Sequence, residues 1–557
     1  MSEGAERYGR RAFLARGAAG AGALAFGGIG TGALLDACGG TPAGTPHGSS
    51  SSAGTGRPRR GGNLIVGVNS EIDGFLPAQN HFDNSGIDYA NAVYDTLTRI
   101  AADGTAQPYL AQSVTPNADR TVWTVALRPG VVFHDGSPLT ADVVVANFQA
   151  LKASPLTGQA VTPVTSAKAT GALTVDFTAD EPLVAFPYYL ATQVGYVVAL
   201  SQLSAADGSS HPVGTGPFTL VSWEPNDHLT LQRNPHYWRS GLPYLDTITY
   251  RPIVADSSRE LSLKSGTIDL MVTRDPRAIT DLAHDSGFTQ VRSQHAGHGS
   301  LDMDFIMLNT AVAPLSDLTV RQALAHALDT TQLARVFGSG VAKPDTSPFP
   351  PGSPFRAPDN GYPTFDLNKA KALVAQAAPA HGGTISLTLG TITDPRLLEV
   401  VQAVQQMWGQ AGIQVTINQT QQVSFIADLA LGSYQAVTSE QFSAPDPDLN
   451  YVWWSSTTAA GPGKIALNFA RNRDDQLEAA LQTGRTSTDP ATRAQAYQTV
   501  DKRLAADLPY LWLSPATWSC TARSTVANIA GGTLPGGQLA QGFTGGAFYP
   551  TELWRTA

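Results

Sequence analysis

Cysteine is almost absent from this chain, which has two cysteines, Cys38 and Cys520, among 557 residues. Cys38 lies at the end of an N-terminal segment with the features of a processing signal. If Cys38 is modified there, Cys520 has no partner within the chain, and no intrachain disulfide can form. Cys520 is then expected to be a small buried apolar residue.

Charge is also sparse. Charged residues make up 15% of the chain, and 45 acidic against 36 basic residues give a net charge of −9. An acidic chain repels a phosphate backbone, so nucleic acid is not expected as a partner. The hydrophobic share of 42% is ordinary for a globular protein. The length suits about three or four domains, and equally one large two-lobed body.

Local motifs of common enzyme and metal sites are missing. The sequence has no G-x-S-x-G elbow, no H-E-x-x-H pair and no Cys/His arrangement. Its one close histidine pair, His295 and His298, supplies at most half of the donors that a metal site needs. No metal, no cofactor and no enzymatic activity is therefore expected. Paired acids for glycoside hydrolysis stay open, because their separation is defined only in three dimensions.

The first 38 residues resemble an export signal. Arg10 and Arg11 precede Ala-Phe-Leu, which resembles the twin-arginine pattern R-R-x-F-L. An apolar run over residues 17–35, rich in Gly and Ala, leads to Leu-Asp-Ala-Cys-Gly. This resembles a lipobox, in which the cysteine, here Cys38, is acylated and becomes the new N-terminus. The alternative is a transmembrane helix, which such a glycine-rich run forms poorly.

Residues 39–61 consist mostly of Gly, Ser, Thr and Pro, with almost no apolar side chain. Such a segment cannot bury enough surface to order itself, so we expect a flexible linker. The run at residues 62–68, with its β-branched residues, predicts a buried first strand of the folded body.

The most informative stretch is residues 121–148, in which a strand, a turn and the start of a helix follow one another. Residues 121–127 alternate like a half-buried strand, and Asp135-Gly136 suits a tight turn. Thr140 is a good N-cap, and the helix after it is expected to bury one apolar face. That face consists of Val143, Val144 and Phe148.

Other patterns extend this picture. Apolar spacing predicts a helix over residues 90–100 and another over 317–329, whose Arg321 is expected to make a structural ion pair. Residues 173–177 and 194–200 are expected to be short strands, and residues 344–363 a loop. Strand, helix and strand over residues 385–418 form a βαβ unit, which indicates an α/β lobe.

The sequence of residues 127–148 resembles the pattern "L-R-x-G-V-x-F-H-D-G-x-P-[LF]-T-A-x-D-V", which is found in the family 5 extracellular solute-binding proteins of ABC importers. These are binders of peptides, nickel or oligosaccharides. Four further segments of this chain resemble patterns of that family, and they occur in the same order as in the family. They are P-x-L-A at 108–111, G-T-G-P-[YF] within 211–220, L-x-R-N-P-x-Y-W at 229–238 and D-x-x-V-R-Q-A within 317–329.

The resemblance implies an α/β fold of two lobes, like the periplasmic binding proteins of type II and cluster C, with an extra subdomain. The first lobe would consist of residues 62–75, 213–305 and 501–557, with the subdomain 76–212 inserted, and the second lobe of residues 306–500. A small solute would bind between the lobes and pass to a membrane permease. The protein would act as a monomer, lipid-anchored to the outer face of the cytoplasmic membrane.

The resemblance also suggests which residues face the ligand, although each has a structural alternative. Glu71 could instead be a solvated loop carboxylate, and Tyr94 a packed tyrosine. Asp446 and Asp448 could shape a turn, with Trp453 and Trp454 in the core. The six candidate ligand-binding residues are thus Glu71, Tyr94, Asp446, Asp448, Trp453 and Trp454.

The ligand class stays open at this stage. Peptide-binding members have an aspartate a few residues before the D-P-D turn, where this chain has Ser443 or Ala444. This difference weakens the case for a peptide, while aromatic residues beside carboxylates suit sugars or amphiphilic cations. An oligopeptide or similar solute is the main expectation, with an oligosaccharide or a metal chelate as alternatives. A secreted hydrolase and a surface adhesin are the competing functions.

Overall fold

The computed structural model describes residues 56–80, 82–154, 157–293, 299–441, 444–529 and 531–556. All of them belong to the unit Ser51–Ala557. The residues predicted to carry the export signal and the lipid, Arg10, Arg11 and Cys38, lie outside the described residues, as do His295, His298 and Ser443.

The first sheet has seven strands in the order β12-β18-β11-β1-β10-β9-β8. Its central strand β1 lies parallel to β10 and β11, and the chain reaches these neighbours only after long excursions. The strands are β1 (Asn63–Val68), β8 (Phe218–Glu224), β9 (His228–Arg233), β10 (Thr247–Pro252), β11 (Leu270–Thr273), β12 (Phe288–Arg292) and β18 (Ser519–Arg523).

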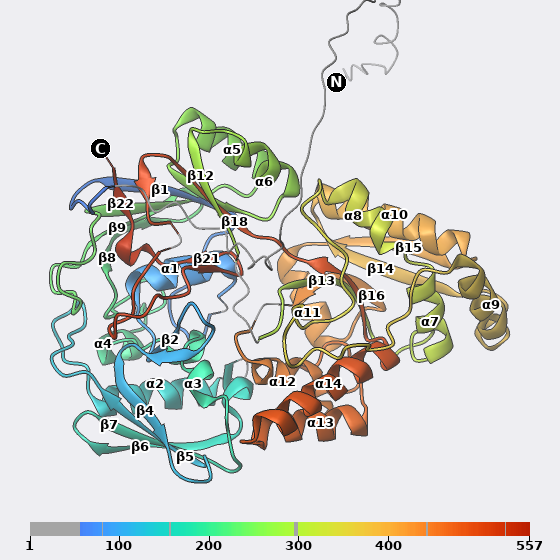
Figure 1. Ribbon diagram of the computed structural model, residues 1–557, viewed down its shortest axis with the longest axis horizontal. Coiled ribbons are helices and arrows are strands. Elements are labelled where there is room, and N and C mark those ends of the chain that lie inside the picture. Colours follow the sequence, from blue (N-terminus) through green and yellow to red (C-terminus); the bar gives the residue numbers. More distant parts are fainter. Residues whose placement is uncertain are drawn as a thin grey trace, which may run out of the picture. The chain divides into compact units, whose positions relative to one another are not determined.

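The strand predicted at residues 62–68 is thus confirmed as β1, and it is apolar because both of its faces are covered. Leu64 and Val66 pack against helix α1, while Ile65 points to the cluster below helices α5 and α6. Figure 1 shows α5 and α6 side by side near β12. These helices are α1 (Asn84–Val93), α5 (Asp256–Ser265) and α6 (Pro276–Ala283).

The second sheet has five strands in the order β15-β14-β16-β13-β17. The predicted βαβ unit is confirmed, since β14 and β15 are parallel and helix α10 connects them. The strands are β13 (Met303–Leu308), β14 (Ser386–Ile392), β15 (Gln414–Thr420), β16 (Ala436–Gln441) and β17 (Tyr510–Pro515).

Both faces of the second sheet are covered by helices. Along β13, Ile306 and Leu308 join the core beneath α7, α9 and α10, whereas Phe305 and Met307 join the core beneath α11, α13 and α14. This alternation is the period of two expected of a strand. The helices are α7 (Leu318–His326), α8 (Thr330–Phe337), α9 (Leu367–Ala377), α10 (Pro395–Gln410), α11 (Gln422–Leu431), α12 (Tyr451–Trp454), α13 (Asp475–Thr486) and α14 (Pro490–Asp507).

The third sheet has four antiparallel strands in the order β4-β5-β7-β6, and α2 lies against it (Figure 1). The strand predicted at 121–127 is β5, and Val143, Val144 and Phe148 of α2 are buried as expected. Thr140 is the N-cap residue, but its side chain makes no capping hydrogen bond. The elements are β4 (Ala111–Pro116), β5 (Val122–Leu127), β6 (Val164–Gly171), β7 (Thr174–Ala179) and α2 (Ala141–Ala153).

The remaining strands and α-helices are short. They are the strands β2 (Thr98–Ile100), β3 (Ala106–Pro108), β19 (Val526–Ala527), β20 (Phe543–Thr544), β21 (Ala547–Phe548) and β22 (Trp554–Arg555), and the helices α3 (Phe186–Tyr189) and α4 (Leu200–Ser204). Among the described residues, no helix combines the length and the apolar character needed to cross a bilayer.

Three predictions of local structure were wrong. The helix expected over residues 90–100 ends at Val93, and its last part is strand β2. No strand forms over residues 194–200, because a short helical turn ends at Gly195, Tyr196 makes only an isolated bridge to Thr96, and α4 begins at Leu200. Arg321 forms no ion pair with a described residue, and its guanidinium donates instead to the backbone carbonyls of Leu315 and Asp507.

The chain from residue 501 to 515, expected in the first lobe, is part of the second sheet and its cover. Helix α14 continues to Asp507, and β17 then pairs with β13. The polypeptide therefore returns to the first sheet only after Pro515, when it enters β18.

The motif residues of the third and first sheets meet at the end of α1. His134 accepts a hydrogen bond from the amide of Gly214 at Nδ1, and its Nε2–H donates to the carbonyl of Gly216. Burial lowers the pKa of His134 to about 4, so the ring is neutral at pH 7. The histidine of the F-H-D-G segment thus holds the G-T-G-P turn in place.

The same turn lies directly on the end of α1, which explains its two glycines. A Cβ added at Gly216 would lie 2.4 Å from the carbonyl carbon of Val93 and 2.6 Å from the amide nitrogen of Tyr94. A Cβ at Gly214 would lie 2.0 Å from the carbonyl oxygen of Val93. Both contacts are to backbone atoms, which cannot move aside without displacing the helix end.

Gly216→Ala is therefore expected to lower the free energy of unfolding by about 3 kcal/mol, because the methyl group overlaps backbone. Gly409→Ala is the matched control, since Gly409 lies in α10 with no atom within 4 Å of an added Cβ. That change is expected to be neutral or to stabilise by up to about 1 kcal/mol. Urea unfolding of both variants measures the difference, and equal stability of the two would contradict the packing argument.

Candidate ligand-binding site

Asp446 and Asp448 lie in one short turn and are both buried, with exposures of 4% and 1%. Asp446 precedes the helical turn Pro447–Asn450 and accepts a hydrogen bond from the amide of Asp448 at 2.9 Å. Arg493 of α14 pairs with the same carboxylate at 2.6 Å. The D-P-D segment therefore shapes a turn, and its first carboxylate already has two partners.

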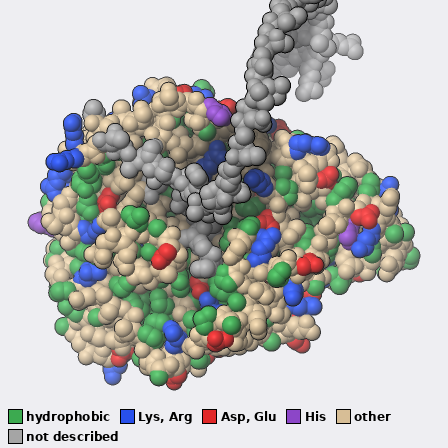
Figure 2. Space-filling view, in the orientation of Figure 1, with side chains coloured by type: hydrophobic (Ala, Val, Ile, Leu, Met, Phe, Trp, Pro, Cys, Tyr) green, Lys and Arg blue, Asp and Glu red, His purple; other side chains and the backbone are tan. Residues whose placement is uncertain are grey.

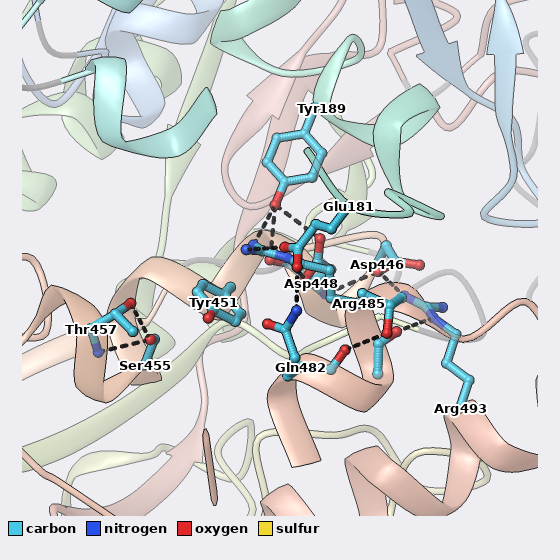
Figure 3. A network of polar contacts seen from close by, with 12 residues as sticks. Glu181, Tyr189, Asp446, Asp448, Tyr451, Ser455, Thr457, Gln482, Arg485 and Arg493 are labelled. Carbon is cyan, nitrogen blue, oxygen red and sulfur yellow. Dashed lines mark hydrogen bonds and ion pairs between the residues drawn. The ribbon is translucent and has the colours of Figure 1, made fainter. Parts of the chain in front are cut away.

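Asp448 is the centre of a polar network between two parts of the molecule, shown in Figure 3. Its carboxylate accepts a hydrogen bond from Arg485 Nε at 3.0 Å and another from the hydroxyl of Tyr189 at 3.0 Å. Burial raises the pKa of the Asp448 carboxyl, and the charge of Arg485 opposes that rise. The Arg485 guanidinium also lies 3.5 Å from the centre of the Tyr451 ring.

Two further residues extend the network across the same boundary. Glu181 pairs with Arg485 at 3.6 Å and accepts a hydrogen bond from Gln482. Glu181 and Tyr189 follow the third sheet in the chain, whereas Arg485 and Gln482 lie on α13 beside the second sheet. The network thus connects the part of the chain around the third sheet to the part around the second.

Glu71 and Tyr94 lie elsewhere and are linked through Phe75 of the first-sheet core, whose ring packs against Tyr94 and against Trp223, the hydrogen-bond partner of Glu71. Glu71 is half-buried and accepts hydrogen bonds from Trp223 Nε1 at 2.8 Å and from the amide of Asn226. Tyr94 is buried, and its hydroxyl donates to the carbonyl of Phe75 and accepts from Gln202. Burial raises the pKa of Tyr94, so the hydroxyl stays protonated.

The two tryptophans differ in exposure. Trp454 is 1% exposed, donates from Nε1 to Gln441 at 3.2 Å and packs edge-on against Phe349. Trp453 is only partly buried, and its ring centre lies 5.4 Å from that of Phe469. Of the six candidate residues, Glu71 and Trp453 therefore keep the most exposure to solvent. The structure brings the six together as two groups rather than one.

The residues that sequence reasoning missed are those whose partners lie far along the chain. Arg485, Arg493 and Tyr189 sit in helical or loop segments, and nothing in the local pattern distinguishes a buried arginine from an exposed one. One signal could have indicated these residues. A buried carboxylate requires a counter-charge, so two buried aspartates in D-P-D imply nearby arginine or lysine side chains.

A cavity of about 370 Å³ lies within the second-sheet part and not at any candidate residue. Its lining includes Thr388, Asn418, Phe425, Asp428, Tyr434 and Val437. Within the described ranges, no cluster of three or more His, Cys, Asp or Glu residues is placed to hold a metal ion. Cys520 is fully buried, as predicted.

Comparison with known proteins relates this geometry to one family. The model of the family described as bacterial extracellular solute-binding proteins, family 5, middle part, matches residues 105–462. The glutathione-binding protein GsiB of Pectobacterium atrosepticum is 27% identical over 472 residues, which are 81% of this chain and 88% of that protein. Protein XP55 of Streptomyces lividans is 28% identical over 498 residues, which are 86% and 88% of the two chains.

Solved structures have the same fold. The periplasmic binding protein DppA from Helicobacter pylori, in complex with the peptide STSA, aligns with a TM-score of 0.78 at 24% identity, covering 89% of this chain and 99% of that one. NikZ from Campylobacter jejuni, in complex with Ni(L-His), aligns with a TM-score of 0.75 at 21% identity, covering 87% and 97%. The predicted two-lobed α/β fold is thereby confirmed.

Arg485→Met is expected to lower the free energy of unfolding by about 3 to 5 kcal/mol, because it leaves the Asp448 carboxylate buried without its counter-charge. Adding Asp448→Asn should recover part of that loss, since a neutral amide then replaces the buried carboxylate. Arg335→Met on the exposed surface of α8 is the control and should change stability by less than about 0.5 kcal/mol. Additive effects of the two buried substitutions in urea unfolding would show that the pair is not coupled.

Proposed function

Because the chain belongs to family 5 of the bacterial extracellular solute-binding proteins, we propose that it is the exported, lipid-anchored receptor of an ABC import system. It captures a small solute between two lobes and delivers it to a membrane permease. The family match over residues 105–462 carries this proposal. The arrangement of two large sheets supports it, since the chain passes between them only through the β12–β13 and β17–β18 connections.

The lobes of this receptor follow from the sheets. The first lobe consists of residues 62–75, 213–302 and 516–557, with residues 76–212 as an inserted subdomain that carries the third sheet. The second lobe consists of residues 303–515, since β17 belongs to the second sheet and α14 packs against that sheet. Two connections allow the lobes to rotate about a hinge and to close on a ligand.

The ligand proposed first is an oligopeptide or a similar small solute. GsiB is named for glutathione, and DppA was solved with a peptide, which supports this class. The absence of aspartate at positions 443 and 444 keeps an oligosaccharide or a metal chelate as the alternative, and NikZ with Ni(L-His) shows that the fold accepts a chelate. Acidic and basic side chains lie interspersed over the face drawn in Figure 2, which suits a small solute better than a polyanion.

Among the six candidate residues, Glu71 and Trp453 are proposed to contact the ligand directly, because their side chains are only partly buried. Tyr94, Asp446, Asp448 and Trp454 are proposed to hold the segments that carry the contacts. Their polar groups are already paired within the protein.

Mass spectrometry of the molecules that co-purify, followed by thermal-shift screening of peptides, oligosaccharides and metal chelates, tests the proposed function. A ligand should raise the melting temperature in a concentration-dependent way, with a stabilisation of about 2.7 kcal/mol at one hundred times its Kd. Trp453→Ala should weaken its binding, whereas Phe365→Ala, which removes an exposed aromatic side chain just before α9, should not. Chemical turnover of a bound compound, or no binding in any class, would contradict the receptor function.

Export and anchoring are tested on the full-length chain in a bacterial host with a twin-arginine pathway. Replacing Arg10 and Arg11 by lysine should retain the protein in the cytosol, because the transport machinery reads the arginine pair. Cys38→Ala should prevent incorporation of labelled palmitate and release the exported protein from the membrane fraction. Export of the double-lysine variant at the normal level would contradict the twin-arginine signal. Palmitate labelling of Cys38→Ala would contradict Cys38 as the lipidated residue.

A further inference from the structure

The two connections between the large sheets lie side by side and are hydrogen-bonded to each other. The amide of Ser293 donates to the carbonyl of Trp518 at 2.8 Å, and the amide of Ala516 donates to the carbonyl of Asp302 at 2.7 Å. The indole of Trp518 also donates to the carboxylate of Asp302 at 2.7 Å. Any rotation of one sheet relative to the other therefore changes the contacts between the side chains next to these two connections.

Two carboxylates face each other beside these connections. Asp304 on β13 and Glu440 on β16 are direct cross-strand partners in the second sheet. Like charges in that position repel, because the side chains of opposed residues lie within about 5 Å of each other. No cation of the second sheet is paired with them among the described residues. The pair is thus an unfavourable feature of the second lobe taken alone.

The counter-charge comes from the other lobe. Arg274, which directly follows β11 of the first sheet, forms ion pairs with both Asp304 and Glu440. Its guanidinium lies 5.6 Å from the centre of the Trp518 ring, and its side chain is 18% exposed. One arginine of the first lobe therefore offsets the repulsion within an acid pair of the second lobe.

A third carboxylate increases the demand for this positive charge. Asp302 is fully buried next to the same group, and its Oδ1 has no hydrogen-bond partner among the described residues. Burial raises the pKa of the Asp302 carboxyl to about 7. The charge of Asp304 also raises this pKa, whereas the charge of Arg274 and the hydrogen bond from Trp518 lower it. Arg274 is the only cation paired with these three carboxylates in the described part of the chain.

We propose that Arg274 is a positioning residue for solute capture: by pairing with Asp304 and Glu440 across the hinge, it sets how far the two lobes close. The proposal rests on the receptor function proposed above. When the lobes separate, Arg274 leaves the acid pair, and the repulsion between the two carboxylates opposes opening. The pair thus favours the closed arrangement before any solute binds, which strengthens the apparent affinity in proportion to the closed fraction.

The exposed ion pair between Arg277 on α6 and Glu399 on α10 provides a matched control. It also joins the two lobes, but its atoms are 4.0 Å apart and its side chains are 72% and 56% exposed. Such a pair is screened by water and salt and contributes little. Its removal should leave closure unchanged, although it deletes the same type of interaction between the same two lobes.

The test measures small-angle X-ray scattering of the ligand-free, lipid-free mature chain, so it does not depend on knowing the solute. Arg274→Met should increase the radius of gyration, because the attraction between the lobes that favours the closed state is then lost. The double variant Asp304→Asn, Glu440→Gln should do the same, because Arg274 then loses its partners. Combining all three substitutions should increase the radius of gyration no further than either change alone, because the same interaction is then lost only once. Arg274→Lys should restore most of the wild-type value. Arg277→Met should have no effect.

Once a solute is identified, its affinity should be weakened about 10-fold by Arg274→Met and no further in the triple variant, whereas substitutions that merely destabilise would have additive effects. Unchanged scattering in both Arg274→Met and the acid double variant, or additive effects in the triple variant, would overturn the proposal even if solute binding is normal. If no solute binds while the radii of gyration of the variants change as expected, the receptor function fails and the role of Arg274 at the hinge stands.

Discussion

A buried carboxylate, Asp95, holds the first lobe together. It receives hydrogen bonds from Thr215 at 3.1 Å, Tyr237 at 3.2 Å and Trp238 at 2.9 Å, which belong to two segments more than a hundred residues away. Burial raises the pKa of Asp95 to about 6, and the three donors oppose that rise. A buried acid is tolerated only where donors or charges compensate its loss of water. The end of α1, the G-T-G-P turn and the N-P-x-Y-W segment are consequently fixed to one another.

This arrangement gives a structural meaning to the motifs that point to the family. His134 of the F-H-D-G segment holds the turn between Gly214 and Gly216, and the turn lies on the end of α1. None of these residues is among the six ligand candidates. The patterns that identify the family thus describe how the first lobe and its inserted sheet are joined, whereas the choice of solute is left to other positions, in agreement with relatives solved with a peptide and with Ni(L-His).

Ion pairs and charged hydrogen bonds also connect segments that are distant in the sequence. Asp448 with Arg485 and Tyr189, and Arg274 with Asp304 and Glu440, both connect parts of the chain that carry different sheets. Buried ion pairs contribute little net stability, because desolvation offsets much of the attraction, but breaking one is costly. Their effect is to favour one relative position of the connected parts. In the proposed receptor, whose lobes would open and close, such pairs influence that equilibrium more than the overall stability.

By itself, the sequence determined the family, the α/β class and the regular elements with strong periodicity, such as β1, β5 and the βαβ unit, because these depend on local patterns of apolar residues and turns. It failed where tertiary contacts override the local pattern. The helical stripe over residues 90–100 stops at Val93 because the chain must turn there to bring Asp95 to its three donors. Only the tertiary structure decided which charges are buried and paired, since Arg274, Arg485 and Tyr189 meet partners far along the chain. Local propensity carries no information on such contacts, because their energy depends on solvent exclusion and on distances that exist only after folding.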